Sequence, residues 1–328
     1  MFRHFLKTAT LATVFLIASQ SNMMAQDPEF TQYYANPLYT NPAFAGAGNG
    51  CGGRFVMSYR NQWPSLARTF ETYAASFDRH YDNLAGGIGF LVTHDVAGTG
   101  LLTTTTASGI YSYELPVNHD LTVRAGVQAS FHYKSLDWSI LTFSDMIEPR
   151  SGFVLPTNEP QPATSITFPN FSTGILAYTS AYYGGIAIHN LIEPNQSFYK
   201  STAPGANLPR RYTVHGGINL KYGGSKTTIT PNVLFMVQRQ FVQTNFGFYI
   251  SRASFVTGLW YRQTRPNSDA LMILIGFKQG AFKFGYSYDV TVSDARVAAT
   301  GSHEITAGIE LKCRSRYNRP QMLRCPDF

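Results

Sequence analysis

The sequence has little charge and little cysteine. Asp, Glu, Lys and Arg make up 14% of its 328 residues, well below the share of about 25% found in soluble globular domains. Its three cysteines are too few for a disulfide framework, and its apolar runs are all shorter than a transmembrane helix requires. A disordered chain is poor in aromatic residues, whereas 14% of this one is Phe, Trp or Tyr. These shortages exclude a disulfide scaffold, a helical membrane protein and a disordered chain.

Uncharged polar residues, glycine and aromatics are abundant, and apolar and polar side chains alternate with a period of two up to residue 312. In residues 282–290, for example, one face carries Phe282, Phe284, Tyr286, Tyr288 and Val290, and the other carries Lys283, Gly285, Ser287 and Asp289. Such alternation predicts half-buried β-strands. A soluble sandwich turns the apolar face inward, whereas a transmembrane barrel turns it toward lipid. The periodicity alone leaves both architectures open.

We expect fourteen strands, an even number, as in bacterial outer-membrane barrels. Many of them approach the 9–11 residues that cross a bilayer at a tilt. They lie near residues 53–60, 69–79, 84–94, 101–115, 121–133, 170–180, 181–189, 211–222, 227–239, 242–252, 254–263, 270–279, 281–290 and 303–312.

The lengths of the connections favour the barrel. Links after even-numbered strands are short, such as His80–Asn83 and Ser180-Ala181, whereas most links after odd-numbered strands are longer, such as Lys134–Pro169 and Asn190–Arg210. Only the link around Gln240-Phe241 departs from this rule. Outer-membrane barrels have short periplasmic turns and longer extracellular loops, so short and long links alternate. A sandwich with Greek-key crossings is not expected to show this alternation. The sequence therefore predicts a single all-β domain, an antiparallel transmembrane β-barrel.

The first residues have the features of a secretory signal peptide. Arg3 and Lys7 precede a short apolar segment, Thr10–Ala18, and we expect cleavage between Ala25 and Gln26. We therefore expect an exported protein of the outer membrane. It divides into a signal peptide (1–25), an N-terminal periplasmic or plug segment (26–52), the barrel (53–312) and a basic periplasmic tail (313–328).

The segment that follows reads QDPEFTQYYANPLYTNPAFAG over residues 26–46. Its two Asn-Pro steps, Asn36-Pro37 and Asn41-Pro42, favour turns. An irregular leader is one interpretation. We prefer an ordered segment, packed at the periplasmic mouth or inside the barrel, because the segment carries five aromatic residues that require burial: Phe30, Tyr33, Tyr34, Tyr39 and Phe44.

The C-terminal tail is basic, with only Asp327 opposing its arginines. It is a solvated end, an end that contacts anionic lipid headgroups, or a docking element for a periplasmic partner. Disulfides persist in the periplasm, and eleven residues separate Cys313 from Cys325, so this pair forms the easiest loop to close. Cys51 competes if the barrel brings its ends together, and an unpaired tail is the alternative.

Three stretches resemble the PorP/SprF family of type IX secretion system outer-membrane proteins: residues 26–46, Asn61-Gln62-Trp63-Pro64 and the terminal Cys325-Pro326-Asp327-Phe328. The resemblance implies a barrel that works with periplasmic ring proteins or lipoproteins of the secretion machine, or with a large secreted adhesin in gliding motility. The candidate partner-binding or structural residues are Asn36, Pro37, Asn41, Pro42, Gly46, Trp63, Arg314, Arg316, Arg319, Arg324, Cys325 and Pro326, with Cys313–Cys325 as a possible disulfide.

We expect no enzyme and no catalytic, cofactor-binding, metal-binding or nucleic-acid-binding residues. His189-Asn190 and Ser302-His303-Glu304 are the nearest approach to an outer-membrane phospholipase site. Adjacent residues of a strand point to opposite faces, so neither cluster forms a triad by itself. A passive porin or a hydrophobic-solute transporter is the alternative function.

The alternation predicts which side chains face lipid, and the loop lengths predict which loop is exposed at the cell surface. We expect Phe246, Phe248, Phe282, Phe284, Tyr286, Ile305 and Ile309 to face lipid, with Phe284 near the bilayer midplane and Gly285 facing the lumen. The 36-residue loop Lys134–Pro169 is expected at the cell surface, as a lid or as a partner contact, because loops of such length are functional or disordered.

Overall fold

The structure is a computed structural model, and it describes residues 27–48, 52–65, 70–98, 101–160, 162–199, 206–221, 227–265, 270–292 and 301–311. The expected signal peptide, the three cysteines and the tail with Arg314, Arg316, Arg319, Arg324 and Pro326 lie outside the described residues.

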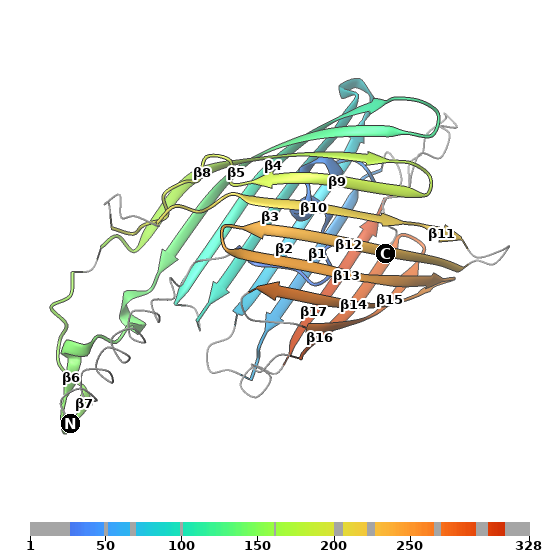
Figure 1. The fold of residues 1–328 in the computed structure, drawn as a ribbon. Helices are drawn as coiled ribbons and strands as arrows, with labels where there is room; N and C mark the ends of the chain where they lie inside the picture. Colours follow the sequence, from blue (N-terminus) through green and yellow to red (C-terminus); the bar gives the residue numbers. More distant parts are fainter. Residues whose placement is uncertain are drawn as a thin grey trace, which may run out of the picture.

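All the described strands except β6 and β7, which form a separate two-stranded sheet, belong to one antiparallel sheet that closes into a barrel (Figure 1). Sequence neighbours pair with one another, and the first and last strands close the barrel through a register that sets Arg54 opposite Glu310. The long strands are β1 (Arg54–Gln62), β2 (Phe70–Tyr81), β3 (Gly86–Ala97), β4 (Leu102–Pro116), β5 (Thr122–Leu136), β8 (Ser165–Tyr178), β9 (Tyr182–His189), β10 (Arg211–Ile218), β12 (Thr227–Gln238), β13 (Phe241–Arg252), β14 (Phe255–Arg265), β15 (Ala270–Gln279), β16 (Phe282–Thr291) and β17 (Ser302–Glu310). The predicted fourteen-stranded antiparallel barrel is confirmed.

Two strands differ from expectation. The strand expected over residues 211–222 is interrupted at Asn219, after which β11 (Leu220–Lys221) continues the pairing with β12. The strand expected from residue 170 begins at Ser165. Proline cannot donate to a sheet ladder and is uncommon in the interior of a central strand, yet Pro169 lies within β8 opposite Phe131.

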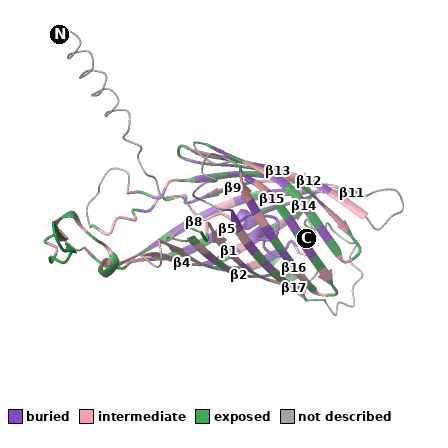
Figure 2. Cartoon of the chain, turned by 90° about the horizontal axis from the view of Figure 1, so that it is seen from below, coloured by how far each residue is buried: buried purple, intermediate pink, exposed green. Residues whose placement is uncertain are grey.

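The outer face carries the predicted apolar side chains. Figure 2 shows exposed and buried residues alternating along the strands. Phe246, Phe248, Phe282, Phe284, Tyr286 and Ile305 are exposed, and Ile309 is half-buried, whereas Gly285 is buried. Aromatic side chains mark both ends of the wall, as in the girdles of outer-membrane barrels. Tyr81, Tyr113, Tyr182 and Phe255 lie at the end with the short turns, and Phe70, Tyr73, Tyr133 and Tyr212 lie at the end with the long loops.

The other described elements are short. They are α2 (Pro37–Thr40), η1 (Pro42–Phe44), η2 (Asp82–Leu84), η3 (Trp138–Ile140), η4 (Ser144–Met146), β6 (Ile147–Glu148) and β7 (Gly152–Phe153). Within the described ranges, no helix combines the length and the apolar character that crossing a membrane would require.

Candidate functional site

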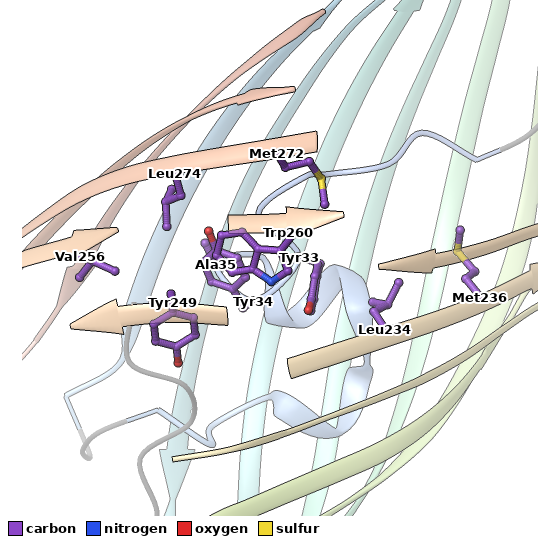
Figure 3. Close-up of a cluster of buried hydrophobic side chains, with 10 residues drawn as sticks. All are labelled: Tyr33, Tyr34, Ala35, Leu234, Met236, Tyr249, Val256, Trp260, Met272 and Leu274. Atoms are coloured by element: carbon purple, nitrogen blue, oxygen red, sulfur yellow. The ribbon is translucent and has the colours of Figure 1, made fainter. Parts of the chain in front are cut away.

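Residues 27–48, here called the plug, lie inside the barrel (Figures 1 and 3). At its start, the Asp27 carboxylate accepts a hydrogen bond of 3.0 Å from Nδ2 of Asn190, which follows β9 at the end of the barrel with the long loops. Near its other end, the amide of Gly46 donates to Asp78 at 2.8 Å, close to the short turn that follows β2. The plug therefore runs along the lumen from the loop end to the turn end.

The two Asn-Pro steps begin the short helices of the plug. Pro37 and Pro42 occupy the first turns of α2 and η1, where the missing amide hydrogen of proline costs nothing. The Asn41 side chain accepts a hydrogen bond of 2.9 Å from the amide of Ala43, which caps η1. Turns are expected at both Asn-Pro steps, and in the structure each step begins a single helical turn.

The same two asparagines join the plug to the barrel wall. Asn36 Oδ1 accepts a hydrogen bond of 2.7 Å from the Ser58 hydroxyl of β1. Asn41 Nδ2 donates to the carbonyl of Ile175 at 3.1 Å and lies 3.1 Å from Nε2 of His215. These contacts give the predicted residues Asn36 and Asn41 a structural role in seating the plug.

Four ionic side chains of the wall form a luminal charge cluster: Arg60, Asp289 and Glu304, which are buried, and Arg262, which is half-buried. Asp289 accepts from Arg262 at 2.7 Å and from Arg60 at 3.1 Å. Arg60 also lies 3.4 Å from the Glu304 carboxylate. The charges of the four groups balance, as buried ionic groups require.

The plug binds to this cluster through its backbone. The amides of Thr31 and Gln32 donate to the two carboxylate oxygens of Glu304 at 2.6 and 3.0 Å. The Thr31 hydroxyl bonds both oxygens of Asp289, at 2.9 and 2.8 Å, and also contacts Arg60. Hydrogen bonds to charged groups contribute more than neutral ones, about 1.5–3 kcal/mol each. The luminal charge cluster thus fixes the register of residues 31 and 32.

An aromatic cluster packs around the middle of the plug (Figure 3). The ring of Tyr34 stacks on Trp260 of β14 with centroids 5.0 Å apart and lies 5.6 Å from the ring of Tyr249. Trp260 Nε1 donates to Asn232 at 2.7 Å, and Asn232 also accepts from the Tyr33 hydroxyl. All five side chains are buried. Of the five aromatic residues of the N-terminal segment, Phe30, Tyr33, Tyr34 and Phe44 are buried, and Tyr39 is half-buried.

At the turn end, the wall contacts the plug through glycines. A Cβ on Gly87 would overlap the carbonyl of Ala45, one on Gly126 would overlap the backbone at Ala43, and one on Gly174 would overlap the side chain of Asn41. We call Gly87, Gly126 and Gly174 the glycine cradle. Because only glycine permits so close an approach, η1 and the residues that flank it lie directly against β3, β5 and β8.

Ion pairs complete the turn end. Arg124, which is 1% exposed, donates to the carbonyls of Ala45 at 2.7 Å and Gly46 at 3.3 Å and pairs with Glu114 at 2.5 Å. Gly46 has a positive φ of 71°, and a Cβ there would lie 2.6 Å from the Cα of Gly87. The predicted residue Gly46 is therefore required by a tight turn in close contact with the wall.

Trp63 lies apart from the plug. It follows β1 at the loop end with a positive φ of 56°, and its amide donates to the carbonyl of Gly301 at 3.0 Å. Its ring packs edge-on against Phe70, with centroids 5.9 Å apart. The structure thus places Trp63 on the rim of the barrel, where it joins the ends of β1 and β2.

The luminal ionic residues Arg60, Arg124, Asp289 and Glu304 are absent from the residues expected from the sequence. A signal for them exists, because each lies in a strand at a position whose alternation points it away from lipid. The alternation indicates a polar lumen but does not reveal which luminal residues meet, since that depends on the closure of the barrel.

The histidine clusters do not converge on a hydrolytic site. His189 is buried with Nε2 3.2 Å from the Thr40 carbonyl, whereas His303 contacts the Tyr286 hydroxyl at 2.8 Å on the outer face. Within the described ranges, no group of three or more His, Cys, Asp or Glu side chains is placed to bind a metal ion.

Comparisons with known proteins decide the family. The model of the type IX secretion system membrane protein family PorP/SprF matches residues 22–309. The chain belongs to the PorP/SprF family. It is a type IX secretion component with an outer-membrane barrel, as the sequence resemblance predicts.

Solved structures agree with the fold. The Ralstonia pickettii toluene transporter TbuX has a TM-score of 0.51 at 11% identity, over 84% of this chain and 93% of that one. The monoaromatic hydrocarbon channel CymD has a TM-score of 0.50 at 11% identity, over 86% of this chain and 94% of that one. At such low identity the likeness concerns the barrel fold alone. A search of curated proteins finds no match.

Proposed function

We propose that this PorP/SprF barrel is a plugged, non-enzymatic anchor of the type IX secretion system, and that it binds protein partners rather than conducting solutes. Its plug supports this proposal most directly. The plug runs from Asp27 at the loop end to Gly46 at the turn end and contacts the wall along its length. A barrel whose lumen is occupied in this way is suited to present its loops and termini to other proteins.

Periplasmic ring proteins or lipoproteins of the machine are the expected partners on the turn side, and a large secreted adhesin is the expected partner on the loop side. The basic tail is the candidate docking element in the periplasm, because four arginines in residues 313–328 complement an acidic protein surface. Supporting export of the adhesin or attaching it to the cell surface is the role that this arrangement favours.

A hydrophobic-solute channel is the second candidate, because TbuX and CymD share the barrel fold and their names give them aromatic hydrocarbon cargo. The lumen beside the plug argues against that cargo here. Arg60, Arg262, Asp289 and Glu304 occupy it near the loop end, and an apolar solute passing between them would disrupt their ionic contacts without replacing them.

Crosslinking followed by mass spectrometry on intact outer membranes tests the proposal. We expect crosslinks from this barrel to periplasmic components of the machine or to a large secreted protein, and we expect them to fall when residues 314–328 are removed. Heat-modifiable mobility on gels verifies that the truncated barrel inserts. A truncated barrel that retains all its crosslinks would exclude the tail as the docking element, and a complete barrel without protein crosslinks would contradict the anchor.

A further inference from the structure

The connection between β5 and β8, residues 137–164, projects from the barrel on the side of the long loops. Figures 1 and 2 show it standing clear of the wall and of the mouth of the lumen. None of its described residues is buried. By the orientation of outer-membrane barrels, this side faces the cell exterior. We call residues 137–164 the projecting loop.

The projecting loop is ordered by its own contacts. Asp145 accepts from the Thr157 hydroxyl at 3.0 Å and from the amide of Asn158 at 2.7 Å, which ties together the two arms of the loop. The amides of Val154 and Leu155 donate to the carbonyl of Met146 at 3.0 and 3.1 Å, next to the β6–β7 pairing. The loop therefore presents a defined surface.

That surface is apolar at its tip. The exposed large apolar side chains of the projecting loop are Ile140, Ile147, Phe153, Val154 and Leu155, with exposed fractions of 44–57%. The apolar side chains of the strands face lipid, whereas these lie outside the bilayer and face water. Grouped apolar side chains in water mark interaction surfaces, because covering them is favourable.

The same loop is acidic. It contains Asp137, Asp145, Glu148 and Glu159 against a single Arg150, a net charge of −3. The complete chain has a net charge of +7, so the negative charge is a local property. A complementary partner carries lysines or arginines around an apolar surface.

We propose that the projecting loop is the docking site for a protein on the outside of the cell, through an apolar surface of that protein rimmed with basic residues. This deepens the proposed function, on which it rests, by naming the chemistry of the outer partner. The like charge of a second copy of the loop disfavours pairing of two loops, and the same repulsion disfavours lipid phosphates. The loop also does not act as a lid, since it stands away from a lumen that the plug already occupies.

Photocrosslinking in intact cells tests this inference, with benzoylphenylalanine in place of Phe153. The control position is Val117, which is 54% exposed in a turn on the periplasmic side. We expect a protein adduct at position 153 that is absent at position 117, and we expect its crosslinked peptide to contain basic residues beside apolar ones. The double variant Glu148→Lys with Glu159→Lys should lower the adduct yield about tenfold, because it places like charges opposite the basic residues of the partner.

A matched charge reversal at Asp120, which lies exposed on the periplasmic side, should leave the adduct unchanged. The inference is overturned by a folded, heat-modifiable barrel that gives no protein adduct at position 153, by an adduct with lipid or with a second copy, or by an adduct that the double reversal leaves intact. Tail-dependent crosslinks to periplasmic components are scored separately. If those persist while the adduct at position 153 fails, the docking loop is wrong and the anchor stands.

Discussion

The plug is bound by different chemistry at its two ends. At the loop end, the carboxylates of Asp289 and Glu304 bind the backbone and side chain of Thr31. At the turn end, charged groups also contact the plug, since Arg124 binds the carbonyl of Ala45 and Asp78 binds the amide of Gly46. Close packing against the glycine cradle is added to these contacts, and among the described residues it has no counterpart at the loop end. Ionic contacts fix a register but depend on every partner being present. Close backbone packing depends on shape, and a single added carbon atom disturbs it.

Removing a partner from the luminal charge cluster should have the largest effect. In Asp289→Ala, Arg60 and Arg262 both lose a buried carboxylate, and breaking a buried ion pair costs about 3–5 kcal/mol. Urea unfolding of the refolded barrel in lipid vesicles measures this loss. Asp120→Ala, in an exposed turn, is the control. If Asp289→Ala lowered the free energy of unfolding no more than the control does, the ionic contacts would not contribute to plug binding.

Substitutions on the lipid-facing side of the wall measure the cost of destabilising the barrel without changing a contact of the plug. Phe246 lies at the centre of β13 and is 50% exposed, so Phe246→Arg should cost about 2–4 kcal/mol because hydrocarbon does not hydrate a charge. Phe284 is expected at the midplane, but it is the third residue of β16 from the turn end, so Phe284→Arg should cost less. Phe246→Leu is the matched control in the same unfolding experiment. Equal costs for both arginines would contradict the depth assigned to these two positions.

Adding a side chain to the glycine cradle should disturb the turn end of the plug. Gly126→Leu forces a side chain against Ala43, and overpacking of this kind costs about 1–3 kcal/mol. Protease cleavage within residues 27–48 reports whether the plug leaves the lumen. Gly109→Leu is the control, because Gly109 lies on the outer face with nothing within 4 Å of a Cβ. Equal protection of the plug in both variants would show that the cradle does not constrain it.

Glu29 gives the smallest expected effect. Burial raises the pKa of this plug carboxyl above its usual range, although Arg262 and Gln243 oppose the shift. A carboxyl with a raised pKa stabilises the folded state at acid pH, and this contribution is lost as the pH rises through the raised value. Glu29→Gln imitates the protonated form, so it should stabilise the barrel at about pH 8 and make little difference at about pH 4. A variant that is destabilised at both values would show that the ionised carboxylate is required.

The fold follows from the sequence almost entirely. The alternation in β13, β16 and β17 and the parity of the loop lengths define the strands, because both are local properties of the chain. The orientation of the outer face follows from the same alternation. Pro169 within β8 and the break at Asn219 could not be predicted, because both depend on which residues lie across the ladder.

The plug could be predicted only in part. Its aromatic residues indicate burial and its Asn-Pro steps indicate turns. The sequence therefore predicts an ordered segment, either at the mouth of the barrel or inside it, and nothing more specific. That Thr31 meets Glu304, 273 residues later in the chain, depends on barrel closure, which has no local signature. The contact between Gly126 and η1 is likewise visible only once the plug and the wall are placed together.

Conductance across a planar lipid bilayer tests the occupied lumen most directly. The complete barrel should give no stepwise conductance if the plug, which runs through the lumen from Asp27 to Gly46, blocks it. The barrel without residues 27–48 should conduct, and Gly126→Leu, which keeps the whole chain, should conduct intermittently as the plug loosens. Stable conductance steps from the complete barrel, equal to those of the variant without the plug, would contradict a plugged anchor and establish an open pore.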